Sequence, residues 1–376
     1  MRPLQSANRR RFQLLLDLLH PAGLGMAPDI HPEDWAGLFM AANLANLTGG
    51  MAWRLREHGL WETAPAEVRD YAEGAAELGR LRAEAQRRQA LELVKRLEER
   101  NIRPILLKGT ASLISGLYPD TGARFSSDID LLIPVERMEE AWSLLVADGY
   151  AKCKVEESDL REDHHHAPIL LHPDRRFGVE LHRHMAPAIL RNALPADEVR
   201  RRAVSLSVDG VTLWIPAMED RLVQCLTNIL VDWGYTYILA LRQLQELRLL
   251  VSAQPDFDWQ GIHRRFAGVG RAGSIGYILQ MASELAGLPA PSGIVPPLGG
   301  RRGKLFVWLT KEWLFAHQSR LRPLIILVSP LVVWRRTLWI IRAAAASGSP
   351  LCHLLRGLRK TVHLAWTSRG LASRQS

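Results

Sequence analysis

The sequence predicts an α+β protein in which a small mixed sheet is flanked by N-terminal and C-terminal helical regions. Helical periodicity covers the first hundred residues and returns after about residue 186, while the stretch between alternates short apolar runs with turn-rich loops. The 376 residues are 47% hydrophobic and 23% charged, as in ordinary globular chains. The predicted divisions are an N-terminal helical region (1–103), an α/β core (104–185), a C-terminal helical domain (186–290), and a Pro/Gly linker with a basic, Trp-rich amphipathic tail (291–376).

The N-terminal region is expected to be entirely helical. Apolar residues recur at three- and four-residue spacing in "HPEDWAGLFMAANLANLTGGMAWRLREHG". The next segment, "PAEVRDYAEGAAELGRLRAEAQRRQALELVKRLEERN", begins with Pro, is rich in Ala, Leu, Glu and Arg, and ends at Asn101. The first twenty residues contain Asp17 within their apolar stretch and no small-residue cleavage site follows, which favours an amphipathic helix over a signal peptide.

The core region reads as alternating strands and helices. "IRPILLKG" is a short apolar run, "TASLISGLY" is one or two helical turns, and "DIDLLIPV" is a strand. "ERMEEAWSLLVADGY" is an amphipathic helix, and "APILLHP" and "FGVELHRH" are two further strands joined by a charged turn. This order predicts a small α/β sheet.

Helices are expected again after about Ala186, most clearly in "MEDRLVQCLTNILVDWG" and "YILALRQLQELRLLVSAQ". The second of these could line an active site or a dimer interface. The three cysteines are widely spaced, so they form neither a disulfide framework nor a thiolate zinc site. A reducing, cytoplasmic location is therefore expected.

Two aspartates at the start of the "DIDLLIPV" strand suggest a metal site. Side chains alternate along a strand, so Asp128 and Asp130 share one face, and Glu180 shares a face with His182 in "GVELH". Neighbouring carboxylates repel each other unless a cation lies between them, and a hard divalent ion is the simplest solution. Three carboxylates on neighbouring strands would hold one or two Mg²⁺ ions. The alternative for the aspartates is loop capping.

The segment "LLKGTAS" is typical of a phosphate-binding turn. A strand is followed by Gly109 and then by Thr110 at a helix start, where free backbone N–H groups can hold a phosphate. Lys108 and Arg124 would neutralise the rest of a triphosphate. Alternatively, Lys108 is only a solvated strand end, and Arg124 pairs with Asp120 or Asp128.

With these motifs in this order, the chain resembles the nucleotidyltransferase superfamily and, more narrowly, the bacterial "uncharacterised nucleotidyltransferase" family. That family has an LKG turn, an Arg several residues before "DIDLL", and an acidic-Leu-His segment. The resemblance spans roughly Asp34 to Leu288, with specific motifs between Leu106 and His184. The superfamily's usual Gly-Ser pair is Gly109-Thr110 here. The resemblance implies catalytic and metal-binding roles for Asp128, Asp130 and Glu180, and nucleotide-binding roles for Lys108, Gly109, Thr110, Arg124, Ser127 and His182.

The resemblance also implies a reaction. The chain would use Mg²⁺ to transfer a nucleoside monophosphate from an NTP such as ATP to an acceptor hydroxyl or phosphate, releasing pyrophosphate. The acceptor, whether small molecule, sugar or peptide, is not readable from these residues. The alternative is a non-catalytic scaffold protein that keeps the fold and is attached to a membrane surface by its tail.

The basic charge of the chain is concentrated in residues 301–376. These residues contain 14 of the 48 Lys and Arg but only one of the 39 acidic residues, so they carry +13 while the first 300 carry −4. In its most hydrophobic stretch, "RPLIILVSPLVVWRRTLWIIRAAAA", the longest uncharged run, Pro323 to Trp334, is 12 residues and too short to span a bilayer, which needs about 20. The tail is equally consistent with peripheral binding to the inner face of an anionic membrane and with docking of its apolar residues onto the protein. Nucleic-acid binding by the tail is less favoured.

Other site classes are disfavoured. The sequence has no GxxxxGK[ST], which excludes a P-loop. Its one GxGxxG, Gly268–Gly273, follows a predicted helix and not a strand, so it gives no sign of a dinucleotide-binding turn. Histidines are dense between His164 and His184, but they show no regular ligand spacing, so a zinc site is disfavoured.

Overall fold

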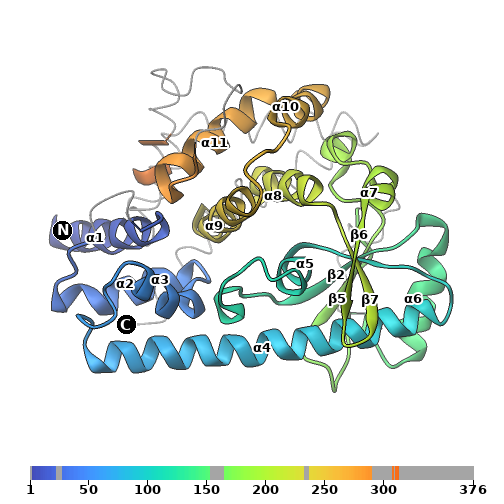
Figure 1. The fold of residues 1–376 in the computed structure, drawn as a ribbon, viewed down its shortest axis with the longest axis horizontal. Helices are drawn as coiled ribbons and strands as arrows, with labels where there is room; N and C mark the ends of the chain where they lie inside the picture. The colour runs from blue at the N-terminus through green and yellow to red at the C-terminus, as the bar shows by residue number, and fades with distance from the viewer. Residues whose placement is uncertain are drawn as a thin grey trace.

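The computed structural model describes residues 2–22, 28–152, 165–232, 237–289, 307–308 and 310–312. It confirms the predicted α+β class: one five-stranded mixed sheet is preceded and followed along the chain by helices. Figure 1 shows the sheet at one end of the molecule and the first three helices at the other. The predicted tail lies outside the described residues except for 307–308 and 310–312.

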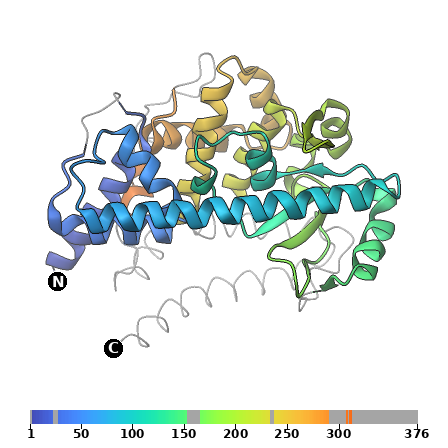
Figure 2. The same ribbon diagram turned by 60° about the horizontal axis from the view of Figure 1, so that its bottom comes forward.

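The N-terminal helices are α1 (Arg2–Leu19), α2 (Trp35–Leu44), α3 (Met51–Glu57) and α4 (Ala66–Glu98). The 33-residue α4 runs along the bottom of the molecule from the helical end to the sheet end in Figure 1, and across its front in Figure 2. Small residues let another chain segment approach it closely: a Cβ on Gly79 would lie 2.4 Å from the carbonyl oxygen of Gly122. Arg80 of α4 secures this contact by pairing with Asp120 at 2.9 Å. The helix therefore serves as a rigid support for the loop that leads into the aspartate strand.

The sheet consists of β1 (Ile105–Leu106), β2 (Asp128–Leu132), β3 (Ala151–Lys152), β4 (Leu170–Leu171) and β5 (Gly178–His182), in the order β1-β2-β5-β4-β3. The central pair, β2 and β5, is parallel, and the other pairs are antiparallel. In the central register Asp130 lies opposite Glu180. Ile129 and Leu131 on the other face are buried against α4 and α6 (Met138–Ala147). The apolar face thus fixes which way the acidic face points.

A β-hairpin interrupts the region that was expected to be helical after Ala186. Following α7 (Ala196–Arg202), strands β6 (Val204–Val208) and β7 (Val211–Ile215) pair in antiparallel fashion. Their turn is Asp209-Gly210, with φ of +50° and +75°, which suits the tight turn between two strands. The Asp-Gly pair between alternating apolar residues is a hairpin signal that the sequence reasoning overlooked. Val211, Leu213 and Ile215 join the core beneath the sheet.

The C-terminal helices are α8 (Met218–Asp232), α9 (Tyr237–Ala253), α10 (Trp259–Gly268) and α11 (Ala272–Ala286). They share one hydrophobic core with the N-terminal helices, so that Phe12 and Leu38 belong to the same cluster as Leu226 and Leu279. The first part of the tail joins it: Val307 is buried there, and Glu312 pairs with Arg9 at 3.0 Å. Within the described residues no helix is long and apolar enough to cross a membrane.

Candidate active site

Strands β2 and β5 bring an aspartate, a glutamate and a histidine together. The Asp130 side chain is 2% exposed, and its Oδ1 lies 2.8 Å from His182 Nε2, which also lies 3.3 Å from Glu180 Oε2. One ligand atom from each of these three residues lies within 4.8 Å of the other two. Their proximity follows from the parallel register, which sets Asp130 beside Glu180 and places His182 two residues further along the same face. Of the three carboxylates predicted to lie together, Asp130 and Glu180 belong to this group, and His182 takes the third place instead of Asp128.

Lys108 lies against the same carboxylates and is not a solvated strand end. It follows β1 at the first position of α5 (Lys108–Ile114), with a positive φ of 47°. Its Nζ lies 2.6 Å from Asp130 Oδ1 and 3.7 Å from Glu180 Oε2. The Leu107 N–H donates to the Asp130 carbonyl oxygen at 2.9 Å, which fixes the turn against β2. In this state, Lys108 supplies a positive charge where two of the predicted metal ligands meet.

The charges around the two aspartates differ, and so do their pKa values. Burial, followed by repulsion from Asp130 and Glu180, raises the pKa of Asp128 to about 6. Burial also favours a higher pKa for Asp130, but Lys108 and the hydrogen-bonded His182 outweigh it and hold that pKa well below its usual range. For His182, the hydrogen bonds to Asp130 and Glu180 outweigh burial and the Lys108 charge, so its pKa is raised. Asp128 has no ion pair within the described part of the chain.

Glutamines of α4 position the loop and the two strands from behind. Gln86 Nε2 lies 3.0 Å from Thr110 Oγ1, 3.0 Å from Ser126 Oγ and 2.8 Å from the Asp128 carbonyl oxygen. Gln89 bonds both backbone groups of Phe177, just before β5, at 2.8 and 3.1 Å. These buried amides couple the position of the acidic strands to the long helix. The sequence reasoning gave neither glutamine a role.

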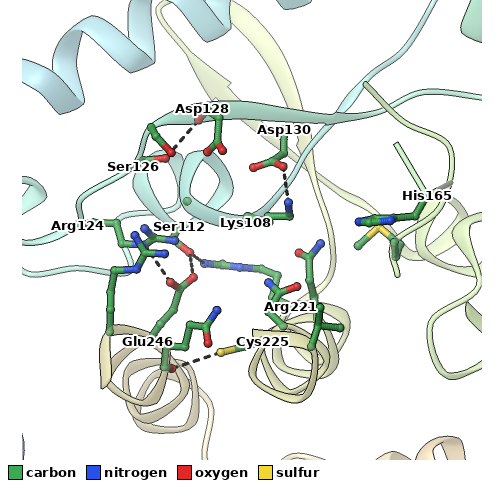
Figure 3. Close-up of a pocket in the computed structure, with 18 of the residues that line it drawn as sticks. Lys108, Ser112, Arg124, Ser126, Asp128, Asp130, His165, Arg221, Cys225 and Glu246 are labelled. Carbon is green, nitrogen blue, oxygen red and sulfur yellow. Dashed lines mark hydrogen bonds and ion pairs between the residues drawn. The ribbon is translucent and has the colours of Figure 1, made fainter. Parts of the chain in front are cut away.

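A cavity of about 230 Å³ opens in front of the carboxylates (Figure 3). Six of the predicted site residues line it: Lys108, Gly109, Arg124, Ser127, Asp128 and Asp130. Glu180, His182 and Thr110 are not among the lining residues. The Thr110 side chain is fully buried with its hydroxyl at Gln86, so its placement does not support the predicted contact with phosphate.

Gly109 is packed too closely for a side chain. A Cβ at this position would lie 2.8 Å from Ser126 Oγ and 3.1 Å from Arg124 Nη2, so one of these groups would have to shift. Glycine therefore allows the turn to pack closely against a serine hydroxyl and a guanidinium group.

The opposite side of the cavity is formed by α8 and α9. Arg124 Nε pairs with Glu246 Oε2 at 2.9 Å, so its partner is neither Asp120 nor Asp128. Ser112 of α5 donates to the other Glu246 oxygen at 2.7 Å. Figure 3 shows Glu246 and Arg221 across the cavity from Asp128 and Asp130. These helix residues were not predicted to be part of the site. Arg242 and Glu246 lie four residues apart in an otherwise apolar helix, and such a charged pair could have indicated them.

Three histidines gather beside the acidic group. The ring centroids of His165 and His166 lie 5.7 and 5.2 Å from that of His182, and 4.4 Å from each other. An isolated antiparallel β-bridge between His166 and His182 places His165 and His166 beside β5. The irregular spacing of these histidines in the sequence does not predict the contact. His164 lies outside the described residues.

The sequence pattern of a known protein family matches the chain. The pattern of the family described as "uncharacterised nucleotidyltransferase" fits residues 31–287, which is more than half of the chain. No curated protein matches the chain. The chain belongs to the uncharacterised nucleotidyltransferase family, and it is therefore a transferase enzyme with an NTP as the implied substrate.

Proposed function

We propose that this nucleotidyltransferase uses Mg²⁺ to transfer a nucleoside monophosphate from an NTP to an acceptor hydroxyl or phosphate. An acceptor hydroxyl gives up its proton to solvent as the acceptor oxygen forms a bond to the α-phosphorus, the bond from that phosphorus to the bridging oxygen breaks, and pyrophosphate leaves with the electron pair. The observation that carries the proposal is the pairing of Asp130 with Glu180 across two parallel strands, at a cavity that also exposes Asp128.

The donor set suits a divalent cation. Asp128 and Asp130 would hold the metal and Glu180 would complete its shell, because carboxylate oxygens are the ligands that Mg²⁺ prefers. Burial, followed by the negative charges of Asp130 and Glu180, raises the pKa of Asp128, and the charges of Lys108 and Arg124 do not fully offset them. When bound, Mg²⁺ would offset the charge of the triphosphate and activate the attacking oxygen.

The other predicted residues have two kinds of role in this proposal. Gly109, Ser127 and Arg124 line the cavity and bind the nucleotide, with Lys108 turning from Asp130 to a phosphate when the metal is present. His182 and Thr110 act as positioning residues. His182 orients Asp130 and Glu180 through its Nε2, and Thr110 anchors Gln86, which holds the Asp128 backbone.

The test is binding of the four NTPs with Mg²⁺, followed by thermal unfolding, in the wild type and in the Asp128→Asn/Asp130→Asn variant. We expect a Mg²⁺-dependent rise in melting temperature with at least one NTP in the wild type and none in the double variant. Asp256→Asn is the control, because Asp256 is an exposed aspartate on a loop outside the cavity. Pyrophosphate release in a cell extract that supplies the acceptor measures turnover. Equal NTP binding by wild type and double variant would refute the proposed metal site.

A further inference from the structure

Three arginines and a single glutamate form the side of the cavity that faces the aspartates. Arg124 comes from the loop before β2, Arg221 from α8, and Arg242 and Glu246 from α9, and all four residues line the cavity. We call this group the arginine cluster. It has a net charge of +2 if each side chain carries its usual charge.

The glutamate is already occupied and does not neutralise all three arginines. Its Oε1 accepts from Ser112 Oγ, and its Oε2 accepts from Arg124 Nε at 2.9 Å. The closest hydrogen-bond acceptor of Arg221 is the Ser112 hydroxyl, at a long 3.4 Å. Arg242 donates to a backbone carbonyl oxygen, that of Phe125, at 3.0 Å, and its Nε is buried without a partner. Two guanidinium groups thus lack a carboxylate partner among the described residues.

Burial of these charges is costly in the absence of a ligand. Arg221 is 6% exposed, and burial lowers its pKa. Burial, followed by repulsion from Arg124, lowers the pKa of Arg242 to about 10, which still leaves it charged at neutral pH. A buried charge without an oppositely charged partner is strongly unfavourable, and a bound anion would relieve that penalty. Asp128 and Asp130 line the other side of the same cavity, so the arginine cluster faces the candidate metal site (Figure 3).

A neutral donor on α8 points to the same kind of ligand. Gln224 is 3% exposed and lines the cavity, and its Nε2 is buried without a hydrogen-bond partner in the described part of the chain. Buried amide donors are almost always satisfied in folded proteins. A ligand with several acceptor oxygens would satisfy this amide together with Arg221, three residues earlier on the same helix.

We propose that Arg221 and Gln224 of α8 and Arg242 of α9 form a subsite that binds a phosphoryl group. The assignment rests on the proposed function and identifies the donor's β- or γ-phosphate as the occupant. Arg124 connects the two regions: its Nη2 lies beside Gly109 of the phosphate turn, and its Nε is held by Glu246 of the arginine cluster. Guanidinium groups bind phosphate oxygens through paired, charge-assisted hydrogen bonds. A phosphate on the acceptor has the same chemistry and is the competing source.

The experiment measures tripolyphosphate binding by calorimetry in the wild type, Arg221→Gln and Arg242→Gln. Loss of one charged hydrogen-bonding group is expected to weaken binding roughly 10- to 100-fold, from about 1.5 to 3 kcal/mol per interaction. The matched control is Arg248→Gln. Arg248 lies on α9, is 5% exposed and, like Arg242, has its pKa lowered by burial to about 10, but it does not line the cavity. Gln224→Leu tests the subsite without any change of charge, should an arginine variant fail to fold.

The outcomes separate the subsite from the metal site. Weaker tripolyphosphate binding in the cavity variants, with wild-type binding in Arg248→Gln, supports the proposal. Unchanged binding in folded cavity variants, or no wild-type binding at millimolar tripolyphosphate, overturns it. If the variants lose orthophosphate binding while a non-hydrolysable NTP is saturating, the donor assignment is overturned in favour of an acceptor phosphate. Mn²⁺ binding, measured by electron paramagnetic resonance, tests the metal site at Asp128 and Asp130 independently of the phosphoryl subsite. If the protein binds tripolyphosphate but no Mn²⁺, the proposed function is contradicted and the subsite is not.

Discussion

Replacing Asp128 with asparagine should stabilise the metal-free protein while removing metal binding. The side chain keeps its shape but can no longer ionise next to Asp130 and Glu180. The pKa of Asp128 rises from 3.8 to about 6 on folding, a change of roughly 2 pH units. At about 1.4 kcal/mol per unit this corresponds to about 3 kcal/mol, and partial exposure of the group reduces the expected gain to about 1–3 kcal/mol.

The sign of the effect follows from proton linkage. Between about pH 4 and 6 the folded wild type binds more protons at Asp128 than the unfolded chain does, so the free energy of unfolding falls as the pH rises. The variant lacks this contribution. The gain from Asp128→Asn should therefore be close to zero near pH 4, grow through pH 6 and stay constant above about pH 7.

Urea unfolding in EDTA, at a series of pH values, measures the difference in free energy. Asp256→Asn provides the control for loss of one exposed negative charge, and it should change stability little at any pH. Adding millimolar Mg²⁺ should stabilise the wild type and reduce its disadvantage, because only the wild type keeps the carboxylate. A destabilising effect of Asp128→Asn, or a gain that is the same at pH 4 and pH 8, would refute the reasoning.

Further predictions concern the residues around the carboxylates and behind them. Lys108→Met removes the cation beside Asp130 and should lower stability at neutral pH by roughly 1–3 kcal/mol in urea unfolding, whereas the exposed Lys152→Met should not. Gly109→Ala places a methyl group 2.8 Å from Ser126 Oγ, so Ser126 or the turn must shift, and we expect a lower melting temperature together with weaker NTP binding in calorimetry; an unchanged affinity would argue against close approach of the phosphates to the turn. Thr110→Val removes one of three acceptors of the Gln86 amide, which keeps Ser126 Oγ and the Asp128 carbonyl oxygen, and should cost about 0.5–1.5 kcal/mol of stability without a loss of NTP affinity beyond that expected from unfolding. Gly122→Ala brings a Cβ to 2.3 Å from the carbonyl oxygen of Ala76 on α4 and should destabilise the protein by about 1–3 kcal/mol in urea unfolding. Gly74→Ala, also on α4 but in open space, should leave stability unchanged or raise it slightly.

The acidic half of the site could be predicted from local sequence because its geometry is local. Alternation along a strand places Asp128 and Asp130 on one face and Glu180 and His182 on one face, and apolar residues on the other face hold that orientation. The predicted site supposed that the two strands are neighbours, and the structure pairs them in parallel. The β6–β7 hairpin was missed although its Asp-Gly turn is also a local signal, because the surrounding helical periodicity dominated the interpretation.

The basic half of the site depended on the tertiary structure. Ser112 and Glu246 are 134 residues apart, and Arg124 and Glu246 are 122 apart, so no local periodicity predicts that they meet. Packing of α8 and α9 against α5 brings them together, and the shared core with the N-terminal helices fixes that packing. The sequence by itself determined the fold class, the family motifs and the direction in which the acidic side chains point. Only the tertiary structure decided that Lys108 lies on Asp130, that Thr110 and His182 lie behind the cavity, and that three arginines face the aspartates, because these contacts join segments whose separation along the chain carries no information about distance in space.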